Sequence, residues 1–414
     1  MVVKINPFVA SGKIVAPPSK SVAHRLLIVS ALKKGKTVIK NVGNSADVIA
    51  TCNCLSALGA NITLQDGNAY VEGIKAVRKG CVLDCNESGS TLRFLLSVSC
   101  ALGANSSFTG SQKLLSRPNE ALISELKNHG IMVEKWNLKG CLTGGKFEID
   151  ASVSSQYVTG LLLALPILNE DSEIVLQGKV VSKDYINITL SILEKSGVKY
   201  KKSGNSIFIK GNQEYLIPDE VVCEGDWSGA AFPLVLGAIG GEVTVEGLNV
   251  KSCQGDKAIL SVLEKAGAII EVDGDVIKVK KANLLAFEQD FENIPDLAPV
   301  CAVLAGVCEG ESVFTSVERL KIKESNRVQT TLAVLHSAGI EAKEDLGRII
   351  IKGGIAKCGV FDGANDHRIV MASAVIASVT NGQSVINGSE AIVKSYPEFF
   401  KDYKKLGGNA DVYV

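Results

Sequence analysis

A short phrase that ends in glycine recurs six times along the chain at a nearly constant spacing. The copies are LSALGANI, LKNHGIMV, LEKSGVKY, LEKAGAII, LHSAGIEA and YKKLGGNA, with glycines at positions 59, 130, 197, 267, 339 and 407. Successive intervals are 71, 67, 70, 72 and 68 residues. Each phrase has charge on one side and apolar residues on the other, which predicts an outward-facing amphipathic helix with a glycine C-cap. The chain is therefore expected to contain six copies of one structural unit.

A second helix follows the same period and is apolar nearly all round, so it is expected to be buried. The six segments cover residues 23–32, 92–102, 158–168, 230–239, 297–307 and 369–379. Short alternating strands come after the amphipathic helices: NAYVEG, KFEIDA, SIFIKG, DVIKVK, RIIIKG and DVYV. Each copy is thus an α+β unit with one buried and one exposed helix. Periodicity alone leaves open one ring of six units or two clusters of three.

Composition limits the class of protein. A chain of 414 residues with 46% hydrophobic residues predicts two or three domains, and we place a crossover at residues 212–226, an extended charged segment. Lys plus Arg equals Asp plus Glu at 44 each, so no overall field favours nucleic acid or anionic lipid. Apolar runs such as 161–168 are shorter than a membrane span, and the N-terminus resembles neither a signal nor a transit peptide. We expect a cytoplasmic protein.

The eleven cysteines are scattered through apolar runs, as expected for a reducing compartment. The pairs Cys52 with Cys54 and Cys81 with Cys85 lack the second pair or flanking histidines of a zinc site. Neither a metal nor another cofactor is expected.

Residues that do not follow the repeat gather where the buried helices begin. Free backbone N–H groups and the helix dipole make such ends suitable for anions. They carry Ser19, Lys20 and Ser21; Ser88, Gly89 and Ser90; Ser154, Ser155 and Gln156; Asp226 and Ser228; Pro295 and Asp296; Asp366, His367 and Arg368. Each serine or aspartate alone is interpreted as an ordinary N-cap. Caps do not need cations, however, so we expect anions to bind the cations in or beside these apolar helices: Lys20, Arg25, Arg93 and Arg368.

The loops before the amphipathic helices hold a second group of polar residues. The group comprises Arg117 with Pro118, Ser182 with Lys183 and Tyr185, Lys323 with Glu324 and Arg327, and Lys394. Lys323 and Arg327 are four residues apart, which predicts that both project from one helix face. Glu324 is a candidate general acid or base.

These residues stand in phrases that resemble those of one family, the 3-phosphoshikimate 1-carboxyvinyltransferases (EPSP synthases), along essentially the whole chain. The phrases, in family order, are PPSKSVAHR, ESGSTLR, SRP, SSQY, SKDY, GDWSGAA, IPD, KIKESNR, NDHR and KSYPEFF. One such phrase would be weak support, whereas ten in order are specific.

The resemblance implies a fold of class α/β, a two-domain inside-out barrel of six βαβαββ-type units. It implies a lower domain at residues 19–223, mainly for shikimate 3-phosphate, and an upper domain of residues 1–18 plus 224–414 that supplies much of the phosphoenolpyruvate site. It places the active site in the interdomain cleft. The implied activity is transfer of the enolpyruvyl group of phosphoenolpyruvate to the 5-hydroxyl of shikimate 3-phosphate, by addition and elimination, in a monomer with small-molecule partners only.

The resemblance also assigns roles to single residues. Implied catalytic residues are Asp296, Glu324, Lys20 and His367, although a satisfied histidine at the edge of the core is an equal alternative for His367. Shikimate 3-phosphate is expected to be bound by Lys20, Ser21, Arg25, Ser154, Ser155, Gln156, Ser182, Tyr185, Asp296 and Lys323. Phosphoenolpyruvate is expected to be bound by Lys20, Gly89, Arg117, Gln156, Arg327, Arg368 and Lys394.

Some positions depart from the family pattern, namely Glu87, Arg319, Asn326 and Asp184. Glu87 places a negative charge near the expected phosphoenolpyruvate pocket. Two related classes remain as alternatives. Enolpyruvyl transferases that act on UDP-N-acetylglucosamine usually carry a reactive cysteine in the second repeat, where GSQKLLSRPNEAL has none. RNA 3′-terminal phosphate cyclases should show a basic stripe and a nucleotide-accepting histidine.

Overall fold

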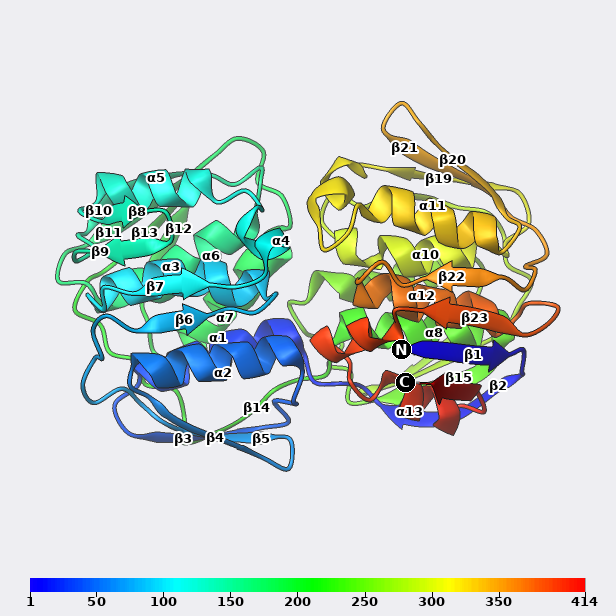
Figure 1. Cartoon of the computed structure of the whole chain (residues 1–414), viewed down its shortest axis with the longest axis horizontal. Coiled ribbons are helices and arrows are strands. Elements are labelled where there is room, and N and C mark those ends of the chain that lie inside the picture. The colour runs from blue at the N-terminus through cyan, green and yellow to red at the C-terminus, as the bar shows by residue number, and fades with distance from the viewer. Residues whose placement is uncertain (414) are drawn as a thin grey trace. The chain divides into compact units, whose positions relative to one another are not determined.

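The computed structural model describes residues 1–413. The chain divides into two compact units (Figure 1). Unit 1 combines Met1–Ser19 with Glu224–Val414, and unit 2 is Lys20–Cys223. Each unit is described by itself below.

Twenty-four strands are described within residues 1–413. Unit 2 holds β3 (Lys36–Lys40), β4 (Asn61–Gln65), β5 (Asn68–Glu72), β6 (Val82–Asp84), β7 (Ser107–Thr109), β8 (Met132–Glu134), β9 (Asn137–Lys139), β10 (Gly145–Asp150), β11 (Ser172–Gln177), β12 (Tyr200–Ser203), β13 (Ser206–Ile209) and β14 (Glu220–Val222). Unit 1 holds β1 (Val2–Asn6), β2 (Ala10–Val15), β15 (Gly241–Glu246), β16 (Ile269–Asp273), β17 (Val276–Lys280), β18 (Glu288–Asp290), β19 (Glu311–Thr315), β20 (Glu341–Asp345), β21 (Arg348–Lys352), β22 (Val360–Asp362), β23 (Ser384–Asn387) and β24 (Asn409–Tyr413).

The six repeats appear as six four-stranded sheets, three in each unit. Unit 2 has the orders β14-β3-β5-β4, β6-β7-β9-β8 and β10-β11-β13-β12, and unit 1 has β16-β17-β15-β2, β18-β19-β21-β20 and β22-β23-β1-β24. Every sheet contains one parallel pair at an edge and two antiparallel pairs, as in β10 with β11, β11 with β13, and β13 with β12. The shared topology confirms that the chain consists of six copies of one α+β unit.

Two of the predicted strands pair with other strands than the repeat pattern predicts. KFEIDA forms β10 and opens the third sheet by parallel pairing with β11, whereas the hairpin of the second repeat is β8 with the short β9. In the sixth sheet the first three residues of DVYV lie in β24, and the last lies outside the described residues. The neighbour of β24 is β1 from the other end of the chain, with Val2 opposite Tyr413. The N-terminal strand therefore completes the last repeat (Figure 1).

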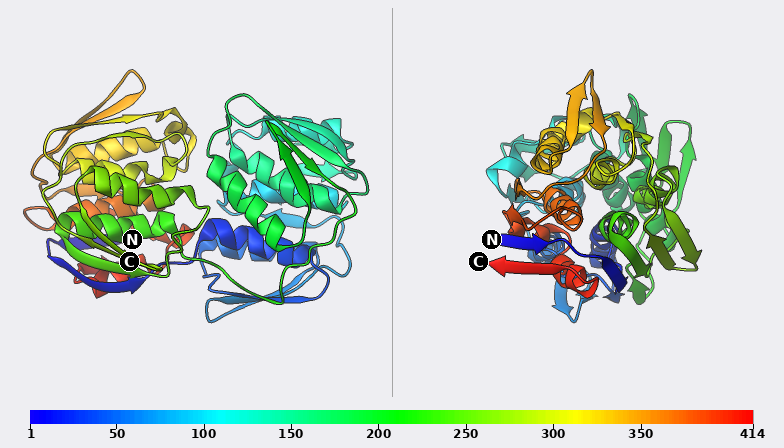
Figure 2. Two further views of the ribbon diagram at one scale, coloured as in Figure 1. Left: turned by 180° about the vertical axis from the view of Figure 1, so that it is seen from behind. Right: turned by 90° about the vertical axis from the view of Figure 1, so that its right-hand side faces the viewer.

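The buried helices are α1 (Lys20–Leu32), α3 (Gly89–Ala101) and α6 (Ser155–Ala164) in unit 2, and α8 (Trp227–Gly240), α10 (Ala298–Ala305) and α12 (His367–Ala377) in unit 1. Most of their residues are buried, as their apolar composition predicts. Within each unit these helices lie inside and the sheets lie at the periphery (Figure 2).

The helices that end in the repeated glycine phrase are α2 (Ala46–Leu58), α5 (Glu120–Asn128), α7 (Lys183–Lys195), α9 (Ile259–Lys265), α11 (Arg327–Ser337) and α13 (Phe399–Lys405). All six glycines have φ between 70 and 120°, in the left-handed region that a side chain would strain, so the predicted C-caps are confirmed. The remaining helices are short: α4 (Gln112–Leu115), η1 (Leu165–Ile167), η2 (Gly255–Ala258), η3 (Pro295–Leu297), η4 (Glu318–Ile322) and η5 (Ser389–Lys394).

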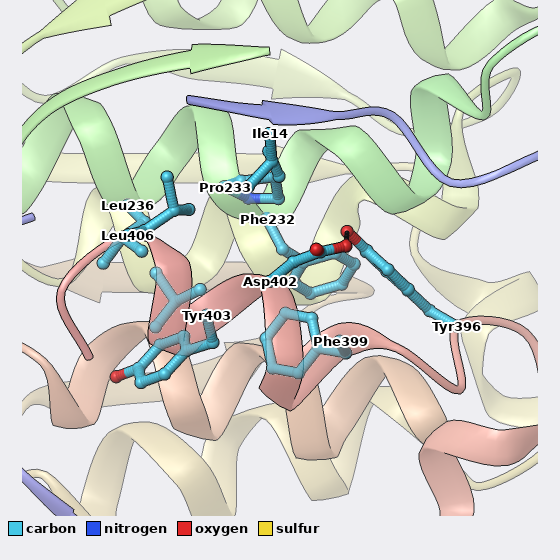
Figure 3. Close-up of a pocket in the computed structure, with 10 residues that line it drawn as sticks. Ile14, Phe232, Pro233, Leu236, Tyr396, Phe399, Asp402, Tyr403 and Leu406 are labelled. Carbon is cyan, nitrogen blue, oxygen red and sulfur yellow. Dashed lines mark hydrogen bonds between the residues drawn. The ribbon is translucent and has the colours of Figure 1, made fainter. Parts of the chain in front are cut away.

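Helix α13 shows how an outer helix is anchored in unit 1 (Figure 3). Its residues Phe399 and Tyr403 line a narrow apolar gap together with Phe232 and Leu236 of α8. Beside them the Tyr396 hydroxyl donates a 2.8 Å hydrogen bond to the carboxylate of Asp402. Across residues 1–413, no helix combines the length and apolar character needed to cross a bilayer.

Candidate functional site

The buried helices begin with true N-caps at four positions. Ser88 accepts a hydrogen bond from the Thr91 N–H at 3.2 Å, and Ser154 accepts one from Gln156 at 3.3 Å. Asp226 and Asp366 accept backbone N–H groups of α8 and α12 at 2.9 and 3.0 Å. The ordinary N-cap interpretation is therefore correct for these side chains, and the nearby cations need a separate explanation.

Lys20, the first residue of α1, forms an ion pair within unit 2. Its Nζ lies 2.8 Å from Oδ2 of Asp47, in the first turn of α2, and both side chains are largely buried. The pair links the beginnings of two helices from one repeat. Because an ammonium group is a mobile point charge, a bound phosphate or carboxylate could share it with Asp47.

Arg25, one turn further along α1, is buried and satisfied by neutral groups. Its Nε donates to Thr189 at 2.7 Å, Nη1 to the Ser21 carbonyl at 2.6 Å, and Nη2 to Thr159 and the Tyr185 carbonyl at 3.2 and 3.0 Å. Burial lowers the pKa of Arg25 to about 9. Hydroxyl and carbonyl oxygens of α1, α6 and α7 already accept its hydrogen bonds, so the burial of Arg25 does not by itself require an anion, and anion binding by Arg25 stays a prediction. Ser182, in the left-handed region at φ 51°, precedes α7 at the same place.

The start of α3 brings Gly89 close to Arg117 and Gln156. A Cβ atom on Gly89 would lie 3.1 Å from Arg117 Nη1 and 3.8 Å from Gln156 Oε1. Arg93 donates to Gln156 Oε1 at 2.7 Å, and Gln156 donates to Ser90 at 3.0 Å. Within the described chain, the buried Nε of Arg117 has no hydrogen-bond partner. A buried donor without an acceptor, beside the beginning of α3, fits an anionic ligand.

In unit 1, Arg327 is surrounded by three carboxylates that come from three different parts of the sequence. The guanidinium, 1% exposed, lies 2.7 Å from Asp296, 2.6 Å from Glu324 and 2.8 Å from Asp366. Asp296 in turn contacts Arg368 at 3.0 Å and Lys323 at 3.6 Å. We call these six side chains the Arg327 cluster.

The charges of the Arg327 cluster shift one another's pKa values. Burial alone would lower the pKa of Arg327, but Asp366, Glu324 and Asp296 outweigh it and hold the pKa well above its usual value. Burial would raise the pKa of Asp366, yet the adjacent Arg327 lowers it. The pKa of Lys323 is lowered, chiefly by burial. The cluster thus holds Arg327 as a cation and Asp366 as an anion at neutral pH.

Two expectations about this region need correction. Lys323 follows the short helix η4 in an extended conformation and Arg327 begins α11, so the two do not share a helix face, although both reach Asp296. Asp296 lies within η3, where the position before the helix is Ile294 and no side chain caps it. The alternative interpretation of Asp296 as an N-cap is therefore wrong.

The last two predicted residues also lie in unit 1. His367 begins α12 and is buried beside Asp366, whose pKa its charge helps to lower. Lys394 ends η5, and its Nζ donates to the backbone carbonyl and side-chain oxygen of Asn365 at 2.7 and 2.8 Å. Among the departures from the family pattern, Asn326 caps α11 by accepting the Gln329 N–H at 3.3 Å.

Sequence reasoning missed Asp47 and Asp256. Asp47 holds Lys20, and Asp256 hydrogen-bonds Ser228 at the start of α8. Asp47 lies in the first turn of α2, and Asp256 lies in η2 immediately before α9, so both stand at the beginning of the exposed helix of a repeat. In the described part of the chain no group of three or more His, Cys, Asp or Glu side chains is placed to hold a metal ion.

Three repeats per unit give this chain the fold of solved enolpyruvyl transferases. The enolpyruvyl transferase NikO from Streptomyces tendae has this fold, with a TM-score of 0.80 and 15% identity over 99% of this chain and 98% of that one. EPSP synthase from Acinetobacter baumannii superposes with a TM-score of 0.84 at 23% identity, and each chain is fully covered.

Sequence comparison narrows the class to one family. The family model for EPSP synthase (3-phosphoshikimate 1-carboxyvinyltransferase) matches residues 7–403. Proteins named 3-phosphoshikimate 1-carboxyvinyltransferase from Clostridium novyi (strain NT) and Clostridium kluyveri are 38% and 39% identical to this chain. In both comparisons 99% of this chain and 98% of the relative are covered. The chain belongs to the EPSP synthase family.

Proposed function

We propose that this chain transfers the enolpyruvyl group of phosphoenolpyruvate to the 5-hydroxyl of shikimate 3-phosphate, giving 5-enolpyruvylshikimate 3-phosphate and phosphate. The observation that carries the proposal is the 38% identity over 99% of the chain to a relative named for this activity. The two groups of cations at helix N-termini support it, because both substrates are anions.

The chemistry is an addition followed by an elimination. The 5-hydroxyl oxygen attacks C2 of phosphoenolpyruvate, C3 gains a proton, and the hydroxyl proton passes to a base. In the second step C3 loses a proton and the bond from C2 to the phosphate oxygen breaks, which restores the double bond and releases phosphate. The protein supplies orientation, proton transfer and charge neutralisation.

The site must above all neutralise charge, because each substrate carries a carboxylate and a phosphate with a charge of about −1.5 to −2. We assign phosphoenolpyruvate to Lys20, Gly89, Arg117, Gln156, Arg327, Arg368 and Lys394. The position of Gly89 beside Arg117 at the beginning of α3, and the Nε of Arg117 that has no hydrogen-bond partner in the described chain, support the unit 2 part of this assignment. Arginine forks suit the carboxylate and phosphate of the substrate.

Shikimate 3-phosphate is assigned to Lys20, Ser21, Arg25, Ser154, Ser155, Gln156, Ser182, Tyr185, Asp296 and Lys323. Most of these residues belong to unit 2, residues 20–223, which we propose as the domain that holds mainly this substrate. Because Arg25 is occupied by neutral oxygens of three helices, its contribution is to fix the positions of Ser21 and Tyr185 as well as to add charge.

Asp296 is assigned as the base for the 5-hydroxyl, with Glu324, Lys20 and His367 as proton-transfer partners. Asp296 forms ion pairs with Arg327, Arg368 and Lys323. An incoming phosphoenolpyruvate carboxylate would compete for the two arginines. Its binding would withdraw cations from Asp296 and thereby make this carboxylate a stronger base.

The assay is phosphate release from purified protein with phosphoenolpyruvate plus shikimate 3-phosphate, compared with phosphoenolpyruvate plus UDP-N-acetylglucosamine. Release with shikimate 3-phosphate alone is the expected result. Release only with the nucleotide sugar would keep the enolpyruvyl transfer and overturn the acceptor, and no release with either would overturn the proposed function. We further propose that the protein is cytoplasmic, is a monomer and does not bind nucleic acid. Light scattering measures the oligomeric state, and retention on RNA at low salt tests nucleic-acid binding.

A further inference from the structure

A chain of buried hydrogen bonds connects three helices of unit 2 beneath the proposed phosphoenolpyruvate residues. His24 Nδ1 in α1 lies 2.7 Å from Thr51 Oγ1 in α2. Thr51 Oγ1 lies 2.7 Å from Thr91 Oγ1 in α3, which donates to Ser88 Oγ, also at 2.7 Å. All four side chains are completely buried. None of them is among the residues that the sequence assigned to a substrate.

The partners of these side chains favour one donor-to-acceptor direction along the series of hydrogen bonds. The hydrogen of the Thr91 hydroxyl serves Ser88 Oγ or the Asp47 carbonyl, which is 3.4 Å away. With the Thr91 hydrogen on one of these two acceptors, Thr51 donates to Thr91 and His24 donates its Nδ1 hydrogen to Thr51. The opposite nitrogen, Nε2, is buried without a hydrogen-bond partner in the described chain. A neutral imidazole with hydrogen on Nδ1 leaves an unpaired acceptor at Nε2, whereas hydrogen on Nε2 would bury a donor that has no acceptor in the described chain, so the Nδ1 form is favoured.

The chain of hydrogen bonds is aligned with the ion pair between Lys20 and Asp47. Lys20 and His24 are four residues apart on α1, and Asp47 and Thr51 are four residues apart on α2, so each pair lies on one helix face. The two helices are therefore joined by two successive cross-links, one charged and one neutral. Through Thr91 and Ser88 the neutral link extends to the N-cap of α3, immediately before Gly89.

We propose that His24 is a positioning residue which, through Thr51 and Thr91, sets the positions of Lys20 and of the Gly89 N-terminus that bind phosphoenolpyruvate. The proposal rests on the proposed function, since that function makes Lys20 and Gly89 binding groups. A small displacement of α3 or α2 would move these groups relative to each other, and substrate binding depends on such placement. His24 itself, completely buried, does not touch substrate.

Thr51→Val tests the proposal, because it removes one hydroxyl from the series of hydrogen bonds while keeping the shape of the side chain. We expect the KM for phosphoenolpyruvate to rise about tenfold, as for a lost buried hydrogen bond. The KM for shikimate 3-phosphate should change less, because Lys20 is the one residue assigned to that substrate whose position we attribute to these hydrogen bonds, whereas Ser154, Ser155 and Ser182 lie outside them. The matched control is Thr37→Val in the same unit: the Thr37 hydroxyl is buried and makes no hydrogen bond in the described chain, so both KM values should stay unchanged.

Two substitutions of His24 separate positioning from a general structural role. His24→Asn offers an amide N–H close to the position of Nδ1 and should restore nearly wild-type KM values, whereas His24→Leu should behave like Thr51→Val. A KM for phosphoenolpyruvate that stays normal in folded Thr51→Val and His24→Leu protein would overturn the proposal, even if their melting temperatures fall.

A readout independent of activity distinguishes failure of the proposal from failure of the proposed function. Nitrogen-15 NMR of the full-length wild-type protein should show a neutral His24 imidazole protonated on Nδ1. The His24 signal is identified as the one that is missing from the spectrum of His24→Asn. Hydrogen on Nε2 would overturn the inferred hydrogen-bond chain. If wild-type protein releases no phosphate from its two proposed substrates, the proposed function fails and the positioning role fails with it, but the NMR result still stands as a test of the chain.

Discussion

The guanidinium of Arg327 and the carboxylate of Asp366 form a buried ion pair with two hydrogen bonds, from Nε at 2.8 Å and from Nη2 at 3.2 Å. Asp366 also caps α12 by accepting the Arg368 N–H and accepts a 2.9 Å hydrogen bond from Ser325. One carboxylate thus fixes the beginnings of α11 and α12 and the arginine assigned to phosphoenolpyruvate.

Asp366→Asn is expected to destabilise the protein by about 3–5 kcal/mol, because it leaves the buried Arg327 with less compensating charge while the amide can still cap α12. Urea unfolding measures the loss. Glu398→Gln is the matched control, since Glu398 pairs with Lys401 at 2.7 Å on the surface and its removal should leave the transition in place. Equal unfolding midpoints for Asp366→Asn and the wild type would show that the pair does not stabilise the fold.

Asp256 predicts a pH dependence of stability in the opposite sense from most carboxylates. Burial, helped by the charge of Asp296, raises its pKa from 3.8 to about 7 in the folded protein. Between these values the unfolded chain releases the proton and the folded protein keeps it, so this group makes the fold less stable as pH rises, with the full effect above about pH 7.

Asp256→Asn removes this titration. The melting temperature of the variant minus that of the wild type should therefore increase from pH 5 to about pH 7 and then level off, as measured by calorimetry in buffers of constant ionic strength. A difference that does not change with pH would mean that Asp256 titrates alike in the folded and unfolded states.

Tyr396→Phe tests the anchoring of the C-terminal segment in unit 1. The lost hydrogen bond joins a buried hydroxyl to the carboxylate of Asp402 at 2.8 Å (Figure 3), and hydrogen bonds to charged groups contribute about 1.5–3 kcal/mol. Asp402 retains only its contact with Lys405 at 2.8 Å. We expect a loss of stability in that range by thermal unfolding. Tyr70→Phe, at a side chain that is 45% exposed, should have no effect, and an equally small effect of Tyr396→Phe would contradict the prediction.

Lys394→Ala should separate binding from stability. The Lys394 ammonium contacts Asn365 on the surface of unit 1, so its loss should leave the melting temperature nearly unchanged. Loss of a cation assigned to phosphoenolpyruvate should lower kcat/KM by about a hundredfold. Lys401→Ala, also at an exposed lysine, provides the control with normal activity. Normal kcat/KM in Lys394→Ala would remove Lys394 from the site.

The sequence determined the repeat architecture because its signals are local. Six glycines end six helices, and in unit 2 the apolar segments form α1, α3 and α6 with starts only three residues before the predicted ones. A helix pattern or a C-cap is set by residues within one or two turns, so it can be recognised without knowledge of the fold. The positions of the charged residues at helix N-termini follow from the same local patterns.

Tertiary structure alone decided which of these residues meet. Asp296 lies 31 residues from Arg327 and 72 from Arg368, and Asp366 lies 39 from Arg327. No short-range pattern encodes such pairs, because they depend on how separate repeats pack. The same holds for the neutral oxygens around Arg25 and for β1, which completes the sixth sheet from the far end of the chain. Local periodicity specified the elements, and packing between repeats chose the partner of each buried charge, since a buried charge is tolerated only where another element supplies its counter-charge or acceptors.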